Sequence, residues 1–160
     1  MKSYFILDCT KQQKIADSLY GYYTGITANR ELKEFWNHLT RDEIQDYFSI
    51  PNNPTKAWFE ELGLKVRDMS FTIYNENIST DIHRDEPPVI AKINFPVLNT
   101  KDTYNVWYDD YANEIDRVEC DRPIVLRSDI LHTVEIGETA CYPRLQFSFC
   151  LYDEPLHLLK

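Results

Sequence analysis

The pattern of hydrophobic and polar positions changes near residue 65 of this 160-residue chain. Before that point, the hydrophobic run SYFILD (residues 3–8) predicts a first strand, and the segments after it carry the start and stop signals of helices. Each is marked by a capping box, by a cap residue, or by Pro near its start and Gly after its end. The expected helices are TKQQKIADSLYGYY with the pair Thr10 and Gln13, RELKEFWNHL capped by Asn29, RDEIQDYF with the pair Thr40 and Glu43, and NPTKAWFEELG with Pro54 and Gly63.

After residue 65, short runs rich in Val, Ile, Tyr and Phe are broken by Asn, Asp, Pro and Gly, which is typical of many short strands. The expected strands are MSFTIY, VIAKINFPV, TYNVWY, PIVL, HTVEI and RLQFSFCLY. No helical segment separates them, so the pattern favours an antiparallel sandwich, barrel or jelly roll over a βαβ fold. We expect one α+β domain over residues 1–160, with mainly helical support in 1–65, a β core in 66–152 and a tail in 153–160.

The last of these runs alternates between two kinds of residue with a period of two. The hydrophobic positions are Leu145, Phe147, Phe149 and Leu151, and the polar side holds Arg144, Gln146, Ser148 and Cys150. The hydrophobic face is expected to pack on the N-terminal helices. The polar face, which begins with Arg144, would then line a cavity.

Composition narrows the class of function. The net charge of −9 argues against a nucleic-acid or anionic-membrane surface, and the four glycines form no phosphate-binding loop. No signal peptide and no hydrophobic run of membrane-spanning length is present. The four cysteines have no CxxC spacing, so we expect reduced cysteines and a cytoplasmic protein.

The segment STDIHRDEPP (79–88) contains His83-Arg84-Asp85, which has two interpretations. As the start of a protein-kinase catalytic loop it needs an Asn five residues after the Asp, where Ile90 stands, and a glycine-rich loop and DFG, which are missing. As His-x-Asp on a strand, it places an imidazole and a carboxylate on one face, roughly 6.5 Å apart along the chain. With a second histidine from another strand, this is the facial triad of non-haem iron sites.

That second histidine is found in RPIVLRSDILHTVEIGETACYPRLQFSF, where His132 begins one expected strand and Arg144 begins the next. If the two strands form a hairpin that is symmetric about Glu138, His132 lies directly opposite Arg144. Residues opposed in this way share a face, with Cβ atoms about 5 Å apart. The hairpin would thus set a metal-type histidine beside an anion-type arginine.

In order and spacing, His83, Asp85, His132 and Arg144 resemble the motif of the Fe(II)/2-oxoglutarate-dependent dioxygenases, over about residues 66–152. The resemblance implies a double-stranded β-helix, or cupin-like jelly roll, with helices packed on its outer face. It implies that His83, Asp85 and His132 hold Fe(II), and that Arg144 pairs with the distal carboxylate of 2-oxoglutarate. A guanidinium suits that role because it stays charged and can donate two parallel hydrogen bonds to a carboxylate.

Members of that family often have a Tyr on the strand before His-x-Asp, which corresponds to Tyr74, and small polar residues two and four positions after the Arg. Gln146 and Ser148 stand at those two positions, so the chain has Arg-Leu-Gln where some members have Arg-x-Ser. The resemblance therefore implies that Tyr74, Gln146 and Ser148 lie near the co-substrate. It leaves the details of co-substrate binding open.

The implied activity is a hydroxylase-type dioxygenase that uses Fe(II), 2-oxoglutarate and O₂ to oxidise a small molecule or a peptide side chain. Members that halogenate lack the carboxylate, so Asp85 favours hydroxylation. The alternative is a jelly-roll protein that binds a ligand or metal, or serves structurally, without oxidative turnover. Cupin isomerases are a minor option, since they usually begin with His-x-His. Substrate identity and oligomeric state are not readable.

Other candidate residues are given simpler roles. His38, near an expected helix end, is interpreted as structural, and His157 as a surface or packing residue. Trp107 and Tyr108 are expected in the core. Asn94 lies on the face opposite its hydrophobic neighbours, so it could reach the cavity.

Overall fold

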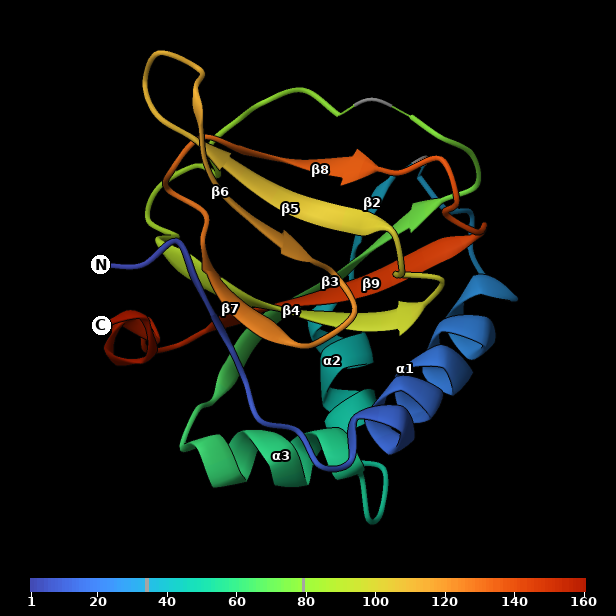
Figure 1. The fold of residues 1–160 in the computed structure, drawn as a ribbon. Helices are drawn as coiled ribbons and strands as arrows, with labels where there is room; N and C mark the ends of the chain where they lie inside the picture. Colours follow the sequence, from blue (N-terminus) through green and yellow to red (C-terminus); the bar gives the residue numbers. More distant parts are fainter. Residues whose placement is uncertain (34, 79) are drawn as a thin grey trace.

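The computed structural model describes residues 1–33, 35–78 and 80–160, which form two antiparallel sheets that face each other (Figure 1). The larger sheet has six strands in the order β1-β7-β4-β9-β3-β2, and the smaller has three in the order β6-β5-β8. The strands are β1 (Tyr4–Ile6), β2 (Trp36–His38), β3 (Val66–Tyr74), β4 (Ala91–Leu98), β5 (Thr103–Tyr108), β6 (Glu114–Glu119), β7 (Ile124–Arg127), β8 (His132–Ile136) and β9 (Arg144–Leu151). The helices are α1 (Gln12–Thr27), α2 (Arg41–Phe48), α3 (Pro54–Leu62) and the 3₁₀ helix η1 (Leu156–Leu159).

The helices cover the outer face of the larger sheet, as Figure 1 shows below the strands. The hydrophobic positions of β9 belong to the same buried core as Ile15 and Leu19 of α1 and Phe59 of α3. The polar positions of β9 point the other way, between the two sheets. The expected α+β class, with a mainly antiparallel core and helices on its outer face, is therefore confirmed.

Two of the four expected helices begin and end as predicted. Thr40 and Glu43 form the capping box at the start of α2, with both reciprocal hydrogen bonds present. Asn53 accepts from the backbone of the first turn of α3, and Gly63 ends that helix in the left-handed conformation, where its φ is 68°. Local capping chemistry is therefore sufficient to place α2 and α3.

The expected capping box at Thr10 is wrong, because α1 starts at Gln12 and its cap residue, Lys11, makes no side-chain hydrogen bond. Gln13, the other half of the predicted pair, instead donates to Asp17 along the helix at 2.8 Å. The helix itself exists, although its start differs from the prediction.

The helix expected over residues 30–39 is wrong as well. Trp36–His38 form the edge strand β2, which pairs with β3. Asn37 both donates to and accepts from the backbone of Lys33. Glu34, within the expected helix, lies outside the described residues. Pairing with the sheet has overridden the local preference for a helix.

The expected hairpin between His132 and Arg144 does not form. β8 pairs with β5 in the smaller sheet, whereas β9 lies between β3 and β4 in the larger one. His132 is opposite Trp107, and Arg144 is opposite Tyr74. The turn after β8 crosses from one sheet to the other, so the symmetry about Glu138 has no structural meaning.

The segment between residues 137 and 143 packs against the turn between β4 and β5. Asp102 in that turn accepts hydrogen bonds from Gly137 N, through its carbonyl, and from Thr139, through its carboxylate. These contacts guide the chain from β8 across to β9.

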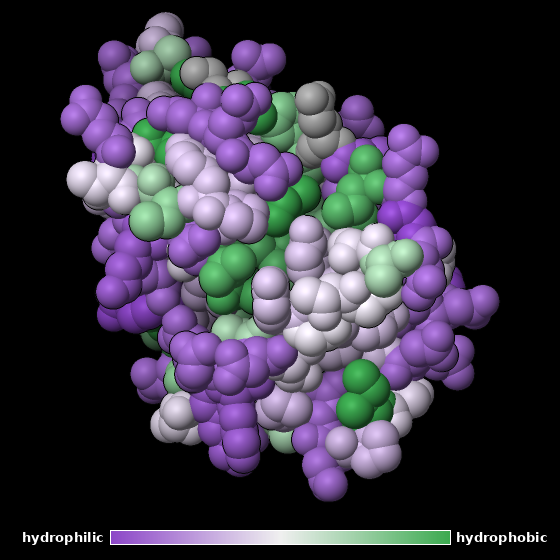
Figure 2. Space-filling view, turned by 90° about the vertical axis from the view of Figure 1, so that its right-hand side faces the viewer, coloured by the Kyte–Doolittle hydropathy of each residue, from purple (hydrophilic) through white to green (hydrophobic). Residues whose placement is uncertain are grey.

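The surface is mixed in character. On the face shown in Figure 2, hydrophobic side chains gather towards the middle and hydrophilic ones surround them. Within the described ranges, no helix combines the length and the hydrophobicity needed to cross a membrane.

Candidate metal centre

The segment between β3 and β4 carries His83 and Asp85 and is fixed by its main chain. His83 and His132 each donate a backbone N–H to the other's carbonyl, at 3.0 and 2.9 Å. Asp85 N donates to Ser128 O at 2.8 Å. Three backbone hydrogen bonds thus hold the His-x-Asp segment against the residues around β8, which brings the two histidines of the sequence motif together.

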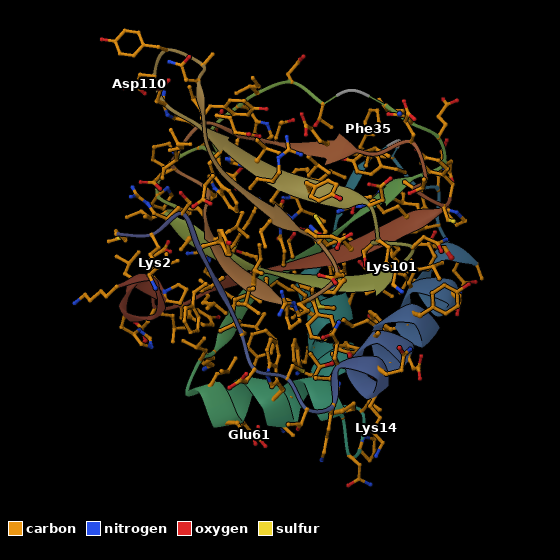
Figure 3. The ribbon with its side chains drawn as sticks, in the orientation of Figure 1. Lys2, Lys14, Phe35, Glu61, Lys101 and Asp110 are labelled. Atoms are coloured by element: carbon orange, nitrogen blue, oxygen red, sulfur yellow. The ribbon has the colours of Figure 1, made fainter. Side chains whose placement is uncertain are left out.

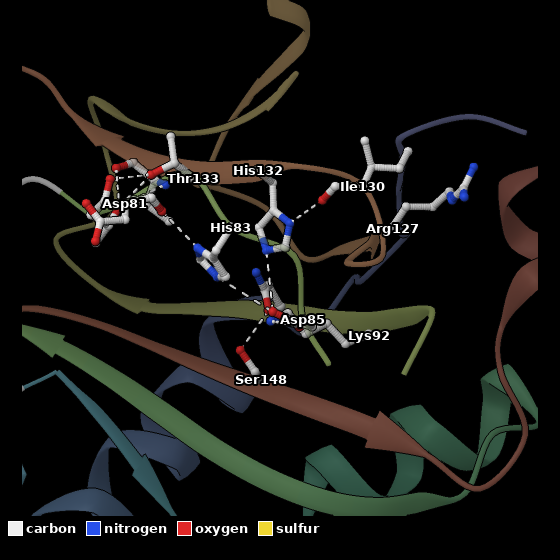
Figure 4. A network of polar contacts seen from close by, with 12 residues as sticks. Asp81, His83, Asp85, Lys92, Arg127, Ile130, His132, Thr133 and Ser148 are labelled. Atoms are coloured by element: carbon white, nitrogen blue, oxygen red, sulfur yellow. Dashed lines mark hydrogen bonds and ion pairs between the residues drawn. The ribbon is translucent and has the colours of Figure 1, made fainter. Parts of the chain in front are cut away.

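The side chains of His83, Asp85 and His132 converge, since one possible ligand atom from each lies within 4.8 Å of the other two. Oδ1 of Asp85 is 3.6 Å from Nε2 of His83 and 3.6 Å from Nε2 of His132 (Figure 4). His132 is buried and Asp85 is partly buried, whereas His83 is exposed at the edge of the group.

The other ring nitrogen of each histidine faces a carbonyl oxygen. Nδ1 of His132 lies 2.7 Å from Ile130 O, and Nδ1 of His83 lies 2.9 Å from Asp81 O. Because a carbonyl only accepts, Nδ1 must carry the proton, and the lone pair of a neutral ring is then on Nε2, towards Asp85. This is the outer hydrogen bond that orients metal-binding histidines in proteins.

Asp85 has a second contact, with Lys92 on β4. Nζ of Lys92 donates to Oδ2 at 2.7 Å, while Oδ1 faces the histidines. Burial by itself would raise the pKa of Asp85, but the Lys92 ammonium, together with His132 whenever its ring carries both protons, more than offsets burial and holds the pKa well below its usual range. Asp85 is therefore a carboxylate at neutral pH.

Arg144 is a buried cation without a neutralising partner. Its exposed fraction is 1%, and no carboxylate of residues 1–33, 35–78 or 80–160 forms an ion pair with it. Nε donates to Thr103 and Nη2 donates to Gln146, both at 3.1 Å, while Nη1 has no hydrogen-bond partner in the described part of the chain. An uncompensated buried charge is costly, so this site fits an anion.

Tyr74 is directly opposite Arg144 in the β3–β9 pair, and the guanidinium lies 5.4 Å from the centre of its ring. Burial raises the pKa of Tyr74, although the Arg144 cation opposes the shift, so the phenol stays protonated at neutral pH. Ser148 is on the same face of β9 as Arg144, four residues further along the strand, and donates to Asn94 Oδ1 at 2.7 Å. The expected polar face of β9 is thus continued on both neighbouring strands.

A cavity of about 650 Å³ lies between the two sheets, and Arg144 is not among its lining residues but lies behind Gln146 and Tyr74, which are. The lining of the cavity includes His83, Asp85, His132, Tyr74, Gln146, Ser148, Asn94 and Lys92. The expectation that Asn94 reaches the cavity is confirmed. Trp107 is a core residue, as predicted, and stacks on Tyr4, whereas Tyr108 is only half-buried.

The interpretation of His38 near a helix end is wrong, because it lies on β2, packs against Trp36 with 3.9 Å between ring centres, and borders the cavity. Lys92 and Thr103 were not predicted at all. The alternation in AKINF offers a signal for Lys92, since it has the same parity as Asn94.

Comparison by sequence gives no match to any family model or to any curated protein. Comparison by structure gives clear matches. The non-heme alpha ketoglutarate dependent epimerase SnoN from nogalamycin biosynthesis has a TM-score of 0.64 and 10% identity, over 95% of this chain and 78% of that one. HygX from Streptomyces hygroscopicus, with nickel and 2-oxoglutarate bound, has a TM-score of 0.60 and 7% identity, over 92% and 81%.

A third match is a prolyl hydroxylase in complex with a hypoxia inducible factor peptide fragment, from Trichoplax adhaerens. It has a TM-score of 0.57 and 10% identity, over 96% of this chain and 84% of that one. At such low identity these likenesses define the fold. The expected double-stranded β-helix, the fold of the Fe(II)/2-oxoglutarate-dependent oxygenases, is confirmed for this chain.

Proposed function

We propose that the protein is a non-haem oxygenase that depends on Fe(II) and 2-oxoglutarate and hydroxylates a small molecule or an amino-acid or peptide side chain. One observation carries the proposal. In the cavity of an oxygenase fold, two histidines and an aspartate lie within 4.8 Å of one another, and a buried arginine without an anionic partner among the described residues lies beside it.

The donor set of the three residues fits ferrous iron. Two neutral imidazole nitrogens and one carboxylate oxygen form the donor set of the facial triad, which is typical of non-haem Fe(II) oxygenases. His83 and His132 present Nε2, and Asp85 presents Oδ1, to a common point. The outer carbonyls of Asp81 and Ile130 fix the ring orientations before any ion binds.

The surroundings of Arg144 fit the distal carboxylate of 2-oxoglutarate. Nη1 has an unused donor, and the neutral groups of Thr103, Gln146 and Tyr74 surround the guanidinium without cancelling its charge. A carboxylate at this point would turn a buried unpaired cation into an ion pair.

When bound, the iron supplies the activation of O₂: 2-oxoglutarate, O₂ and a substrate R–H become succinate, CO₂ and R–OH. The residues of this chain supply position and charge. Asp85 stays ionised because the Lys92 ammonium donates to its carboxylate. The walls of the cavity, from β3, β4, β8 and β9, surround the reacting groups on the side away from the exposed His83.

The substrate class rests on the size of the cavity and on the neighbours. A volume of about 650 Å³ is within the range of small-molecule sites, and part of it is needed for the co-substrate. One structural neighbour is a prolyl hydroxylase in complex with a peptide, which supports a peptide side chain as well as a small molecule.

The test is an anaerobic titration of the protein with Fe(II) and 2-oxoglutarate, followed by exposure to O₂ and measurement of succinate. We expect a weak visible absorption band that needs both Fe(II) and 2-oxoglutarate, and slow formation of succinate without added substrate. If protein that holds Fe(II) gives neither, a binding role without oxidative turnover replaces the proposal.

A further inference from the structure

We propose that Lys92 is a positioning residue of the metal centre: it holds one oxygen of Asp85, so that the carboxylate offers a single oxygen to the ion. The inference rests on the proposed function, because it takes metal binding by His83, Asp85 and His132 as given. It assigns a role to a residue of the cavity wall whose side chain, within the described residues, hydrogen-bonds to Asp85 alone.

The two carboxylate oxygens of Asp85 have different partners. Oδ1 is 3.6 Å from Nε2 of each histidine, whereas Oδ2 accepts a hydrogen bond from the Lys92 ammonium at 2.7 Å. Figure 4 shows Lys92 approaching Asp85 from β4, on the side away from the imidazole rings. Oδ1 is therefore available to an ion, and Oδ2 is occupied by a charged donor.

Lys92 is held in place by the larger sheet. β4 lies between β7 and β9, and Lys92 is paired with Leu126 of β7. Its side chain is 20% exposed and that of Asp85 is 22% exposed, so both belong to the wall of the cavity rather than to the outer surface. A lysine in the middle of a sheet has far less freedom to leave its partner than a lysine on a surface loop.

Hydrogen bonds to its backbone hold both ends of the segment between Asp85 and Lys92. Ser128 accepts from Asp85 N and donates to Ile90 O, at 2.8 and 2.9 Å. Glu154, after the end of β9, accepts from the backbone N–H of Ile90 and of Ala91, at 3.2 and 2.9 Å. These four hydrogen bonds fix both ends of the segment, so the contact between Lys92 and Asp85 is built into the main chain.

A cation beside a metal ligand has two opposing effects on metal binding. The Lys92 ammonium repels a divalent ion and withdraws charge from Asp85, both of which weaken metal binding. The same contact keeps the carboxylate in one orientation, and this strengthens metal binding. Metal affinity is therefore a poor readout of this residue. Its distinct effect is on how many oxygens Asp85 gives to the ion.

The number of oxygens matters for the co-substrate. A carboxylate that binds through both oxygens takes up a position that 2-oxoglutarate or O₂ needs. By occupying Oδ2, Lys92 keeps that position free. Loss of Lys92 should thus weaken 2-oxoglutarate binding, although the residue lies near Asp85 and not near Arg144.

The experiment uses Co(II) alone as the probe, since its visible absorption changes with the number and arrangement of its ligands. Wild-type protein is compared with Lys92→Met, which removes the donor, and Lys92→Arg, which keeps a charged donor. Lys14→Met is the matched control, because Lys14 is exposed on α1, away from the cavity (Figure 3). 2-Oxoglutarate is then titrated into each Co(II)-loaded protein.

We expect Lys92→Met to show an altered Co(II) spectrum and a roughly tenfold higher dissociation constant for 2-oxoglutarate, the lower end of the range for loss of a metal ligand's outer partner. Lys92→Arg and Lys14→Met should match wild type in both. If Lys92→Met does not fold, Lys92→Gln takes its place with the same expectation, because its side chain is too short to replace the ammonium at Oδ2.

The outcomes separate the two proposals. If wild-type protein binds no Co(II), the proposed metal centre itself is wrong. If wild-type protein binds Co(II) and folded Lys92→Met keeps both its spectrum and its affinity for 2-oxoglutarate, the role of Lys92 is wrong and the proposed function stands. Thermal unfolding of the metal-free proteins shows which variants are folded.

Discussion

His83 and His132 are bonded to each other through their main chains, in both directions. The two N–H to O=C hydrogen bonds are 3.0 and 2.9 Å long, and the ring centres are 4.6 Å apart. The bridge is isolated: His132 is the first residue of β8, whereas His83 belongs to no named strand. It determines the distance between the two imidazoles even before an ion is bound.

His132→Ala should lower the affinity for Fe(II) or Co(II) by more than about 100-fold, because loss of an outer partner already costs up to that factor. The measurement is competition with a metal chelator. His38→Ala is the control, since His38 borders the same cavity but is not part of the three-residue group. Equal losses in both variants would show that ions bind to any exposed histidine, and that the proposed centre is wrong.

Arg144→Lys should weaken 2-oxoglutarate binding by roughly 1–3 kcal/mol, the scale of a hydrogen bond to a charged group, because the charge stays but the planar fork is lost. Metal binding should be unchanged, since Arg144 does not belong to the three-residue group. Calorimetric titration of the metal-loaded protein measures both. Arg67→Lys is the control, because Arg67 also borders the cavity but is already paired with Asp68. Unchanged binding of 2-oxoglutarate in Arg144→Lys would contradict the assignment.

Arg144→Met should make the ligand-free protein more stable while it abolishes 2-oxoglutarate binding. The substitution removes a buried cation that lacks an anionic partner in the described ranges and replaces it with an apolar side chain of comparable length. Such replacements are often stabilising, here by about 1 kcal/mol or more. Urea unfolding of the metal-free proteins gives the difference, and a clear loss of stability would mean that Thr103 and Gln146 already compensate the charge.

Gly137→Ala should destabilise the protein, whereas Gly21→Ala should stabilise it. A Cβ at Gly137 would lie 2.2 Å from the Asp102 carboxyl group, which Thr139 and Tyr104 hold in place. Gly21 is in the interior of α1 with nothing within 4 Å of an added Cβ, so Ala there gains about 0.5–1 kcal/mol. The melting temperatures of the two variants should move in opposite directions. A shift of the same sign would show that the Asp102 turn adapts freely.

Several features of the fold can be predicted because they depend on local signals. The alternation along β9 identifies its hydrophobic and polar faces, and the structure buries the former against the helices. The signals at Thr40, Pro54 and Gly63 place α2 and α3. At the helix ends a side chain or a left-handed glycine satisfies backbone groups a few residues away, and along β9 the period of two is itself local, so no knowledge of the rest of the chain is needed.

Predictions that depend on which strands become neighbours did not succeed. β8 and β9 are consecutive and separated by a short segment, which favours a hairpin, yet they belong to different sheets. Residues 36–38 are helical by local preference, but they become a strand because β3 has a free edge. Strand pairing depends on residues that are far apart in the sequence, and no local signal shows which strand pairs with which.

The convergence of His83, Asp85 and His132 was expected from their order in the chain, but the reason proposed for it was only partly correct. Arg144 shares a pair with Tyr74, not with His132. Lys92 could have been assigned to the cavity face from its parity with Asn94, but its contact with Asp85 depends on the fold of the segment between them. Contacts of this kind need the three-dimensional path of the chain.

The two sheets meet at the candidate metal centre. His132 begins a strand of the smaller sheet, while Asp85 is tied through Lys92 to the middle of the larger sheet. An ion bound between them would link the two sheets, so the sheets could separate only if the ion were released. Amide hydrogens of β8 and β4 should then exchange with solvent in step with the occupancy of the centre, while those of the helices on the far face do not.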